Sequence, residues 1–361
     1  MVAAQGDWRK PSYYYSKGVF DIPMENNTNI AYDKPFKTYE EMLSLMSSRN
    51  IIISNPAFAK KVLAGLSYYT IVNGYKNTFL SIPGSDNFIE GTTFEQLYTL
   101  HNIDINLHNI IFKNILFIER YLKTRISYLV SQKYGVYTDK NDLSNMNPND
   151  YLCRDYYLSR NGRNNILKSI KKTLLSDSLN PSIAHYANDK NHIPAWILVT
   201  ALTFGLSIKW YSILKSDDKT DICNQFLDSS DISIDSKKEF LTVSFSLLRE
   251  YRNKIAHGNR TFNLQHLPIL PKQQLIILSH NAISSNEYNR GMGQTNLFAV
   301  ILICFILIDD QYILSNFLRD LNYVLDPYKN TQLNQKTIFE IFGLPNNIIA
   351  RLTKFHSDKF S

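Results

Sequence analysis

The chain has 361 residues, 44% hydrophobic and 20% charged, which is typical of a globular protein with a full core and excludes a disordered polyanion. The formal net charge of +7 fits a polyanionic partner, although many basic proteins have none. The sequence starts without the apolar segment of a signal peptide, and its longest apolar run, residues 297–308, is too short to cross a bilayer. We therefore expect a soluble cytoplasmic protein without a membrane partner.

The three cysteines, Cys153, Cys223 and Cys304, are widely spaced and odd in number. This pattern favours reduced, buried thiols over a disulfide framework. None of the histidines shows metal-ligand spacing with a cysteine or with another histidine, so we expect no metal site and no cofactor.

The N-terminal third of the sequence predicts three helices. Residues 1–33 show no sustained period, and we expect an irregular arm there. Thr38 and Glu41 have the spacing of a capping box, which predicts a helix, and Asn55-Pro56 opens a second one. A loop is expected over residues 76–91.

Thr93 then begins the longest helical pattern of the chain, over residues 94–134. Its apolar stripe comprises Leu97, Leu100, Leu107, Ile111, Phe117, Ile118, Leu122, Ile126 and Leu129. Its polar side carries His101, His108, Glu119, Arg120, Lys123 and Arg125. These polar residues form either a solvated face, the commoner meaning, or a face that contacts RNA or supports a catalytic site.

Residues 138–150, rich in Asn and Asp, predict a break between two regions of the chain. A basic stretch follows, with Arg160, Arg163, Lys168, Lys171 and Lys172. A solvated helix face is again the commoner meaning, but this stretch also offers phosphate contacts.

A helix is then expected from Pro194 through Phe204 to Leu214, with Trp196 and Phe204 in the core.

A motif helix is expected next, capped by Asp235 and ended by Gly258, which enters the left-handed conformation without strain. At about 100° per residue, one arc of this helix is apolar and the opposite arc is polar. The apolar arc contains Leu241, Leu248, Tyr251 and Ile255. The polar arc contains Arg249, Arg252, Asn253 and His257.

The last third predicts a loop over residues 266–293, an apolar helix over residues 296–325 that packs against the motif helix, and two short helices broken at Gly343-Leu344-Pro345. Only short strand signals are present. The class is therefore all-α.

The polar arc indicates phosphodiester chemistry. Arginine binds phosphate through two hydrogen bonds and stabilises the charge that develops in a transition state. Histidine exchanges protons near neutral pH, and Asn253, one helical turn before His257, orients either the ring or the phosphate. The reaction that needs only these groups is metal-independent RNA transesterification.

The spacing Arg-x4-His, with Asn after the Arg, resembles the HEPN superfamily of ribonucleases and RNA-binding domains. The same spacing occurs again at Arg351 and His356. We interpret the second copy as chance, because it lacks the polar residue after Arg and the glycine stop. A second half-site in the tail nevertheless stays open.

Other fragments extend this resemblance, and their order and spacing carry it. They are Lys34-Pro35-Phe36, Leu66-Ser67-Tyr68-Tyr69, Asn73-Gly74-Tyr75, Glu119-Arg120, Arg125, Pro194-Ala195-Trp196, Thr203-Phe204-Gly205, Leu248-Arg249 and Gly343-Leu344-Pro345. With the motif, they are similar to the Abi-like family, the AbiD/AbiF abortive-infection proteins of bacterial phage defence.

The resemblance implies a HEPN-like helical bundle with additional N-terminal helices and irregular loops. It divides the chain into an arm (residues 1–33), an N-terminal helical region (34–150), a HEPN-type domain (151–330) and short C-terminal helices (331–361), with residues 34–361 as one compact unit in the alternative. HEPN toxins that are silenced by nucleotidylation carry Tyr two residues after the His. Here that position is Asn259, which puts this form of control in doubt.

The implied activity is RNA cleavage or RNA binding that arrests growth on infection. Arg252 and His257 match the catalytic pair, and Asn253 matches the polar position. The expected RNA-binding residues are Arg249, Lys254, Arg260, Arg120, Arg125, Arg163, Lys168, Lys171 and Lys172. The implied regulator is a cognate small RNA or the product of a neighbouring gene.

HEPN sites are usually composite, so one motif per chain predicts a homodimer whose interface includes the face from Arg249 to His257. Three functions stay open: a ribonuclease, a catalytically silent RNA-binding module, and a structural role in which Arg252 makes a buried bond and His257 merely caps a helix. The ribonuclease is our first prediction.

Overall fold

The computed structural model describes residues 33–175, 181–228 and 231–361, so the expected N-terminal arm lies almost wholly outside the described residues. The fold is all-α, as predicted. Within the described residues, the strands are β1 (Gln332–Leu333) and β2 (Lys336–Thr337), which pair antiparallel.

The first helices form where their local signals predict them. They are α1 (Tyr39–Ser48), α2 (Pro56–Tyr68), a π-helical turn (Tyr69–Asn73), a 3-10 turn (Lys76–Thr78) and the 41-residue α3 (Phe94–Tyr134). Thr38 and Thr93 each complete a capping box, and Asn55 caps α2 through its side chain. Ser67, at φ 65°, interrupts the helical backbone near the end of α2.

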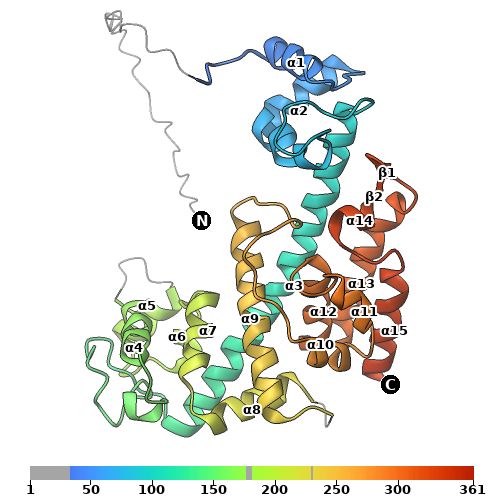
Figure 1. The fold of residues 1–361 in the computed structure, drawn as a ribbon. Coiled ribbons are helices and arrows are strands. Elements are labelled where there is room, and N and C mark those ends of the chain that lie inside the picture. The colour runs from blue at the N-terminus through green and yellow to red at the C-terminus, as the bar shows by residue number, and fades with distance from the viewer. Residues whose placement is uncertain (1–32, 176–180, 229–230) are drawn as a thin grey trace, which may run out of the picture.

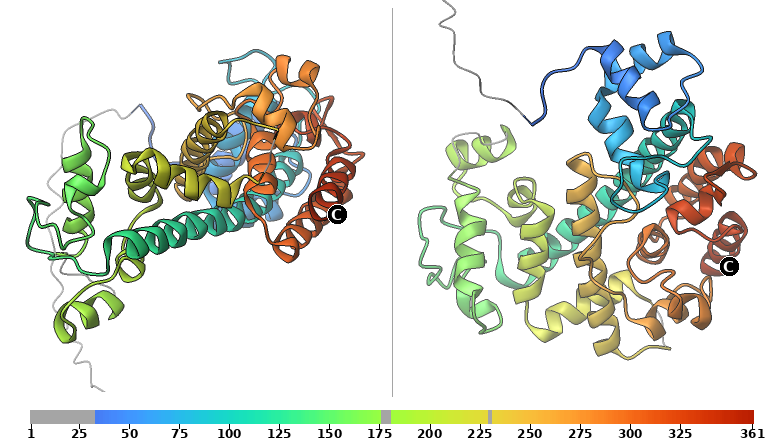
Figure 2. Two further views of the ribbon diagram at one scale, coloured as in Figure 1. Left: turned by 90° about the horizontal axis from the view of Figure 1, so that it is seen from below. Right: turned by 45° about the horizontal axis from the view of Figure 1, so that its top comes forward.

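Helix α3 is the axis around which the other elements pack (Figures 1 and 2). It contacts helices from every later part of the chain, among them α6, α7, α9, α12 and α13. Its predicted stripe is buried, except that Phe117 is half-buried. Figure 1 shows the middle helices on one side of α3 and the C-terminal helices on the other.

The middle elements are a 3-10 turn (Arg154–Tyr156), α4 (Arg163–Lys172), α5 (Pro181–Asp189), α6 (Ala195–Leu198), α7 (Phe204–Ile213), α8 (Ser216–Phe226) and α9 (Ile234–Ala256). The single helix expected from Pro194 is wrong, because α6 ends after one turn and Thr203 caps a new helix. Phe204 is buried as predicted, but Trp196 is 47% exposed. Ser233, rather than Asp235, caps α9.

The C-terminal elements are α10 (Lys272–Leu278), α11 (Ser285–Asn289), α12 (Leu297–Leu307), α13 (Gln311–Leu325), a 3-10 turn (Asp326–Tyr328), α14 (Ile338–Phe342) and α15 (Ile348–Phe360). The stretch expected as a loop therefore contains α10 and α11. The expected helix over residues 296–325 is also broken, because Asp310 caps α13. Lys359 satisfies the end of α12 by donating from Nζ to the carbonyls of Phe305, Ile306 and Ile308.

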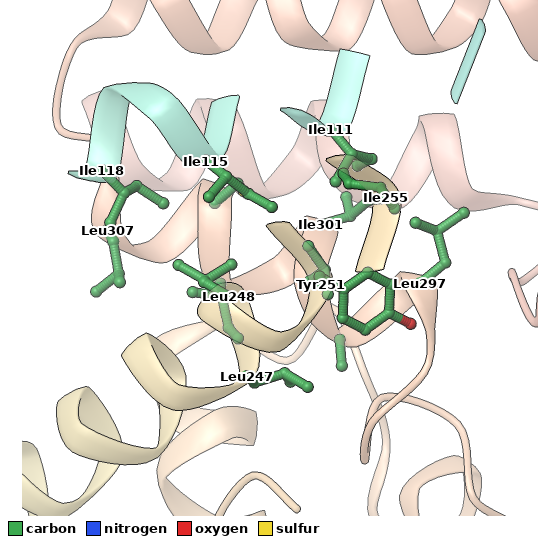
Figure 3. Packing of buried hydrophobic residues seen from close by; sticks show 14 of the residues in the cluster. Ile111, Ile115, Ile118, Leu247, Leu248, Tyr251, Ile255, Leu297, Ile301 and Leu307 are labelled. Carbon is green, nitrogen blue, oxygen red and sulfur yellow. The ribbon is translucent and has the colours of Figure 1, made fainter. Parts of the chain in front are cut away.

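The core lies where α3, α9 and α12 meet (Figure 3). Ile111 and Ile115 of α3 pack near Tyr251 and Ile255 of α9. Every residue of α12 is buried, and the predicted packing of this helix against α9 is confirmed. The three cysteines are free and buried, as expected. Within the described residues, no helix has both the length and the apolarity needed to cross a membrane.

Candidate functional site

The C-terminus of α9 holds His257 at the surface. The N–H of Gly258 donates to the carbonyl of Ile255 at 2.9 Å, and the N–H of Asn259 donates to the carbonyl of Lys254 at 3.0 Å. These two hydrogen bonds at the end of the helix require a residue with left-handed backbone conformation after the C-cap. Gly258 supplies it, with φ +77°. His257 is thus the C-cap, one residue beyond Ala256, which is the last helical residue, and it is exposed.

The two arcs of α9 separate as expected. Leu248, Tyr251 and Ile255 are buried, and the hydroxyl of Tyr251 donates to the carbonyl of Thr295 at 3.1 Å. The polar arc faces outward: Asn253 and His257 are exposed, whereas Arg249 and Arg252 are half-buried. One face of the helix therefore anchors it, and the other presents the motif.

The side chain of Arg252, the first residue of the motif, contacts α3. Its Nε atom is 3.9 Å from Oε2 of Glu119, and its guanidinium lies 5.9 Å from the centre of the Phe112 ring. Nη1 donates a long bond of 3.5 Å to Oδ1 of Asn253. Within the described chain, neither Nε of Arg252 nor Oε2 of Glu119 has a hydrogen-bond partner. Lys123 binds the other oxygen of Glu119 at 2.7 Å. Nε is buried and faces Glu119, so any ligand would meet the outer nitrogens of Arg252, of which Nη1 makes only the long bond to Asn253.

The segment after the motif is tied to α3 by a buried carboxylate, Asp104. Oδ1 of Asp104 accepts from the backbone N–H and the hydroxyl of Thr261 at 2.9 Å and 2.5 Å. Oδ2 accepts from the hydroxyl of Tyr75 at 2.8 Å, and this hydroxyl lies 3.3 Å from Nδ1 of His101. Burial raises the pKa of Asp104, although the bonds from Thr261 and Tyr75 oppose this rise. This network fixes the chain that follows His257.

The residues on the polar side of α3 differ in burial. His101 and Glu119 are buried, which corrects the solvated-face interpretation for these two residues. Arg120 is exposed, and its guanidinium lies 5.4 Å from the centre of the Phe117 ring. His108 is half-buried, and burial lowers its pKa.

The guanidinium of Arg125 binds residues of the protein itself and is not available to a ligand. Its Nη2 atom donates to Asp309 at 3.1 Å, and its guanidinium lies 3.8 Å from the centre of the Phe226 ring. Only 14% of its side chain is exposed. Arg125 is therefore a poor RNA contact, contrary to the expectation.

The basic residues in and around α4 also differ in their exposure to solvent. Lys168 and Lys172 are exposed and Arg163 is half-buried. Lys171 is fully buried, and its Nζ donates to Oδ2 of Asp150 at 2.7 Å. Lys171 thus joins α4 to the preceding loop, and we remove it from the predicted RNA contacts.

The other predicted basic contacts surround the motif. Arg249 forms an ion pair with Glu250 at 2.6 Å, and its side chain passes over Gly205 at the start of α7. Arg260 is half-buried, with its guanidinium 5.4 Å from the centre of the Phe262 ring. Lys254 is half-buried on α9.

The second Arg-x4-His copy serves packing. Arg351 binds both carboxylate oxygens of Glu287, at 2.9 Å and 2.6 Å, and the carbonyl of Ala282 at 3.1 Å. Nε2 of His356 lies 3.0 Å from the hydroxyl oxygen of Ser315. The donors of Arg351 are thus largely used within the fold, in contrast to those of Arg252.

In the structure, Arg252 contacts Asn253 and α3, and His257 is exposed at the C-cap of the same helix. Residues that the sequence analysis did not assign to the site lie beside this helix end. No sequence pattern indicated the roles of four of these residues, which are Phe112, Asp104, Thr261 and Tyr75. Among the described residues, no group of three or more His, Cys, Asp or Glu side chains is arranged to hold a metal ion. A guanidinium and an exposed imidazole at the end of one helix are the groups needed to bind a phosphodiester and to exchange its protons.

Residues 61–263, more than half of the chain and including the motif, match the family described as Abi-like protein. No curated protein and no solved structure matches the chain. The chain therefore belongs to the Abi-like protein family.

Proposed function

We propose that this protein is an abortive-infection effector of bacterial phage defence, and that it cleaves RNA in the cytoplasm by metal-independent transesterification. The observation that carries the proposal is the presence of Arg252 and the exposed His257 within the last turns of α9, whose opposite face is buried in the core. The outer nitrogen Nη1 of Arg252 makes only a long hydrogen bond of 3.5 Å to Asn253. Membership of the Abi-like family supports the biological role.

In this reaction, His257 removes the proton of a ribose 2′-hydroxyl, and the resulting oxygen attacks the neighbouring phosphorus. Arg252 binds the non-bridging oxygens and stabilises the added negative charge of the pentacovalent state. A second acid then protonates the departing 5′-oxygen. The products are a 2′,3′-cyclic phosphate and a 5′-hydroxyl.

The second acid is supplied by a second copy of the chain. Each chain offers one exposed motif histidine, and a two-fold axis near the Arg249-to-His257 face would bring two of them to one phosphate. A homodimer is therefore part of the proposal. Light scattering of the wild-type protein checks the mass, and dilution checks whether cleavage per chain falls when the dimer dissociates.

A catalytically silent RNA-binding protein is the second candidate. One observation favours it: within the described chain, the imidazole of His257 makes no hydrogen bond that would fix its tautomer. Arg252 and the surrounding basic residues would serve binding alone. A cognate small RNA is the partner that this alternative implies, and in the ribonuclease it would be a regulator.

Cleavage of a labelled, mostly single-stranded RNA in EDTA separates the two candidates. We expect wild type to cut, and Arg252→Ala and His257→Ala to lose at least about a hundredfold in rate. The matched controls are Arg351→Ala and His356→Ala, which remove the same residue types from the second copy and should cut like wild type. Binding of RNA by wild type without cutting would instead favour the RNA-binding module.

A further inference from the structure

Three cationic side chains converge at the other end of α9, remote from the motif. Lys238 lies in the first turns of α9, Lys219 lies in α8, and Arg160 precedes α4. Figure 1 shows the start of α9 beside α8, with the motif at the opposite end of the helix. We call Arg160, Lys219 and Lys238 the distal basic cluster.

Among the described residues, no ion pair within 4 Å involves Arg160, Lys219 or Lys238, although the carboxylates Asp235 and Glu239 lie nearby. Nζ of Lys238 donates to the hydroxyl of Ser216 at 3.1 Å, and Nη1 of Arg160 donates to the carbonyl of Ser212 at 3.3 Å. Both partners are neutral. Burial, followed by the charges of Arg160 and Lys238, lowers the pKa of Lys219, which agrees with the closeness of the three cations.

A cavity of about 410 Å³ is lined by Lys219 and Lys238 of this cluster, whereas Arg160 is not among its lining residues. Lys219, Lys238 and Ser216 supply its hydrogen-bond donors, and Leu158 and Val243 supply apolar wall. Asp235 and Glu239 also line it, and Glu239 is engaged by the side-chain amide of Gln274 at 3.3 Å. Cationic donors next to apolar wall suit a nucleotide, whose phosphate is charged and whose ribose and base present apolar surface.

The cluster and the motif lie on the same side of α9. Residues at spacings of three and four share one helical face, and from Lys238 this spacing leads through Thr242 and Arg249 to Asn253. Thr242 and Asn253 are exposed, and Arg249 is half-buried. Lys238 and Arg252 are about 21 Å apart along the helix, at about 1.5 Å per residue. A single-stranded RNA of several nucleotides covers this distance.

We infer that the distal basic cluster is a second phosphate-binding subsite, which holds the backbone of a single-stranded RNA whose scissile phosphate lies at Arg252 and His257. The inference rests on the proposed function for the position of the cut. It adds a direction for the RNA, along α9, and a minimum length for tight binding. Short RNAs reach only one of the two sites.

The test measures binding in the His257→Ala background, so that no RNA is cut. The probes are fluorescein-labelled oligouridylates of three and twelve nucleotides. Lys219→Ala/Lys238→Ala should weaken binding of the 12-mer by about tenfold or more and reduce the slope of log affinity against log salt by about 1.4, at about 0.7 per phosphate contact. The 3-mer should bind the double variant and its parent with affinities within about twofold.

Two further variants keep the test decisive. Lys329→Ala/Lys336→Ala removes two exposed lysines elsewhere and should leave the affinity for the 12-mer unchanged. Lys219→Arg/Lys238→Arg retains the charge and should retain most of the affinity, which separates a lost contact from a lost fold. Equal affinity of the Ala variant and its parent for the 12-mer would overturn the subsite.

Failure of the subsite and failure of the proposed function give different results. If wild type never cuts RNA but binding of the 12-mer depends on Lys219 and Lys238, the subsite stands and the ribonuclease falls. If wild type cuts RNA and the affinity for the 12-mer does not depend on either lysine, the ribonuclease is supported and the subsite is wrong.

Discussion

Nε of Arg252 lies 3.9 Å from Oε2 of Glu119, which is close enough for attraction between the charges and too far for a hydrogen bond. Both atoms lack hydrogen-bond partners in the described chain, and only 9% of the Glu119 side chain is exposed. Because both atoms are buried, Glu119 orients the inner side of the guanidinium, and a phosphate would meet the outer nitrogens, of which Nη1 makes only a long bond to Asn253. We assign Glu119 a positioning role.

Glu119→Gln should test this role, because Gln keeps the shape of the side chain and removes its charge. Arg252 then loses its orienting partner, and we expect the cleavage rate at saturating RNA to fall about tenfold. RNA affinity should stay the same or rise, since a competing carboxylate is gone. Glu250→Gln, which removes the partner of Arg249, is the matched control. An unchanged rate for Glu119→Gln would contradict the positioning role.

Gly258→Ala should destabilise the protein by about 1 kcal/mol, because an L side chain is strained at φ +77°. Gly258→Asn should cost less, since Asn tolerates this conformation better than Ala. Gly65 lies within α2 in open space, so Gly65→Ala should be neutral or stabilising. Urea denaturation measures all three. Equal stability of the two Ala variants would show that the turn after His257 relaxes freely.

Asp104→Asn should loosen the segment that follows the motif. The carboxylate accepts from Thr261 and Tyr75 at once, and an amide in its place turns one acceptor into a donor that opposes the Tyr75 hydroxyl. We expect a loss of about 1 to 3 kcal/mol in the free energy of unfolding. Tyr75→Phe removes one of these bonds and should cost less. A stability loss from Tyr75→Phe as large as that from Asp104→Asn would argue against this assignment.

Acid should weaken the contact between α11 and α15. The hydrogen bond from Arg351 lowers the pKa of Glu287 from 4.5 to about 2. A depressed carboxyl pKa means that the stabilisation is complete above pH 4.5 and is lost as the pH falls toward 2. After allowance for solvent screening, the loss is roughly 1 kcal/mol.

Urea denaturation of wild type and Arg351→Ala between pH 5 and pH 3 measures this loss. Stability of the variant should fall less steeply with acid than that of wild type. Parallel pH profiles would show that Arg351 is free, and would reopen a functional role for the second Arg-x4-His copy.

Local signals predicted local structure well. Thr38 and Thr93 carry their capping partners three residues away, and the bounds of α3 follow from its period and caps. The breaks before Thr203 and at Asp310 were missed, because apolar residues continue across both turns and hide the new caps. The helices α10 and α11 were missed because Pro and Gly residues flank two short helical segments.

In the candidate site, too, only the features that depend on neighbouring residues of the sequence could be predicted. The presented face of α9 could be read from periodicity, since its neighbours in space are also neighbours in sequence. Glu119 and Asp104 approach the motif from more than 130 residues away along the chain, and no local pattern reports such a contact. Lys171 was misassigned for the same reason, because its partner Asp150 lies in another element.

Analysis of the RNA ends produced in EDTA tests the central claim most directly. Mass spectrometry of the fragments should find 2′,3′-cyclic phosphate on the upstream product and a 5′-hydroxyl on the downstream product. A single 2′-deoxy substitution at the cut should block cleavage there, because the attacking hydroxyl is gone. Fragments with 3′-hydroxyl and 5′-phosphate ends, or undiminished cutting of the deoxy substrate, would contradict a reaction carried by Arg252 and His257.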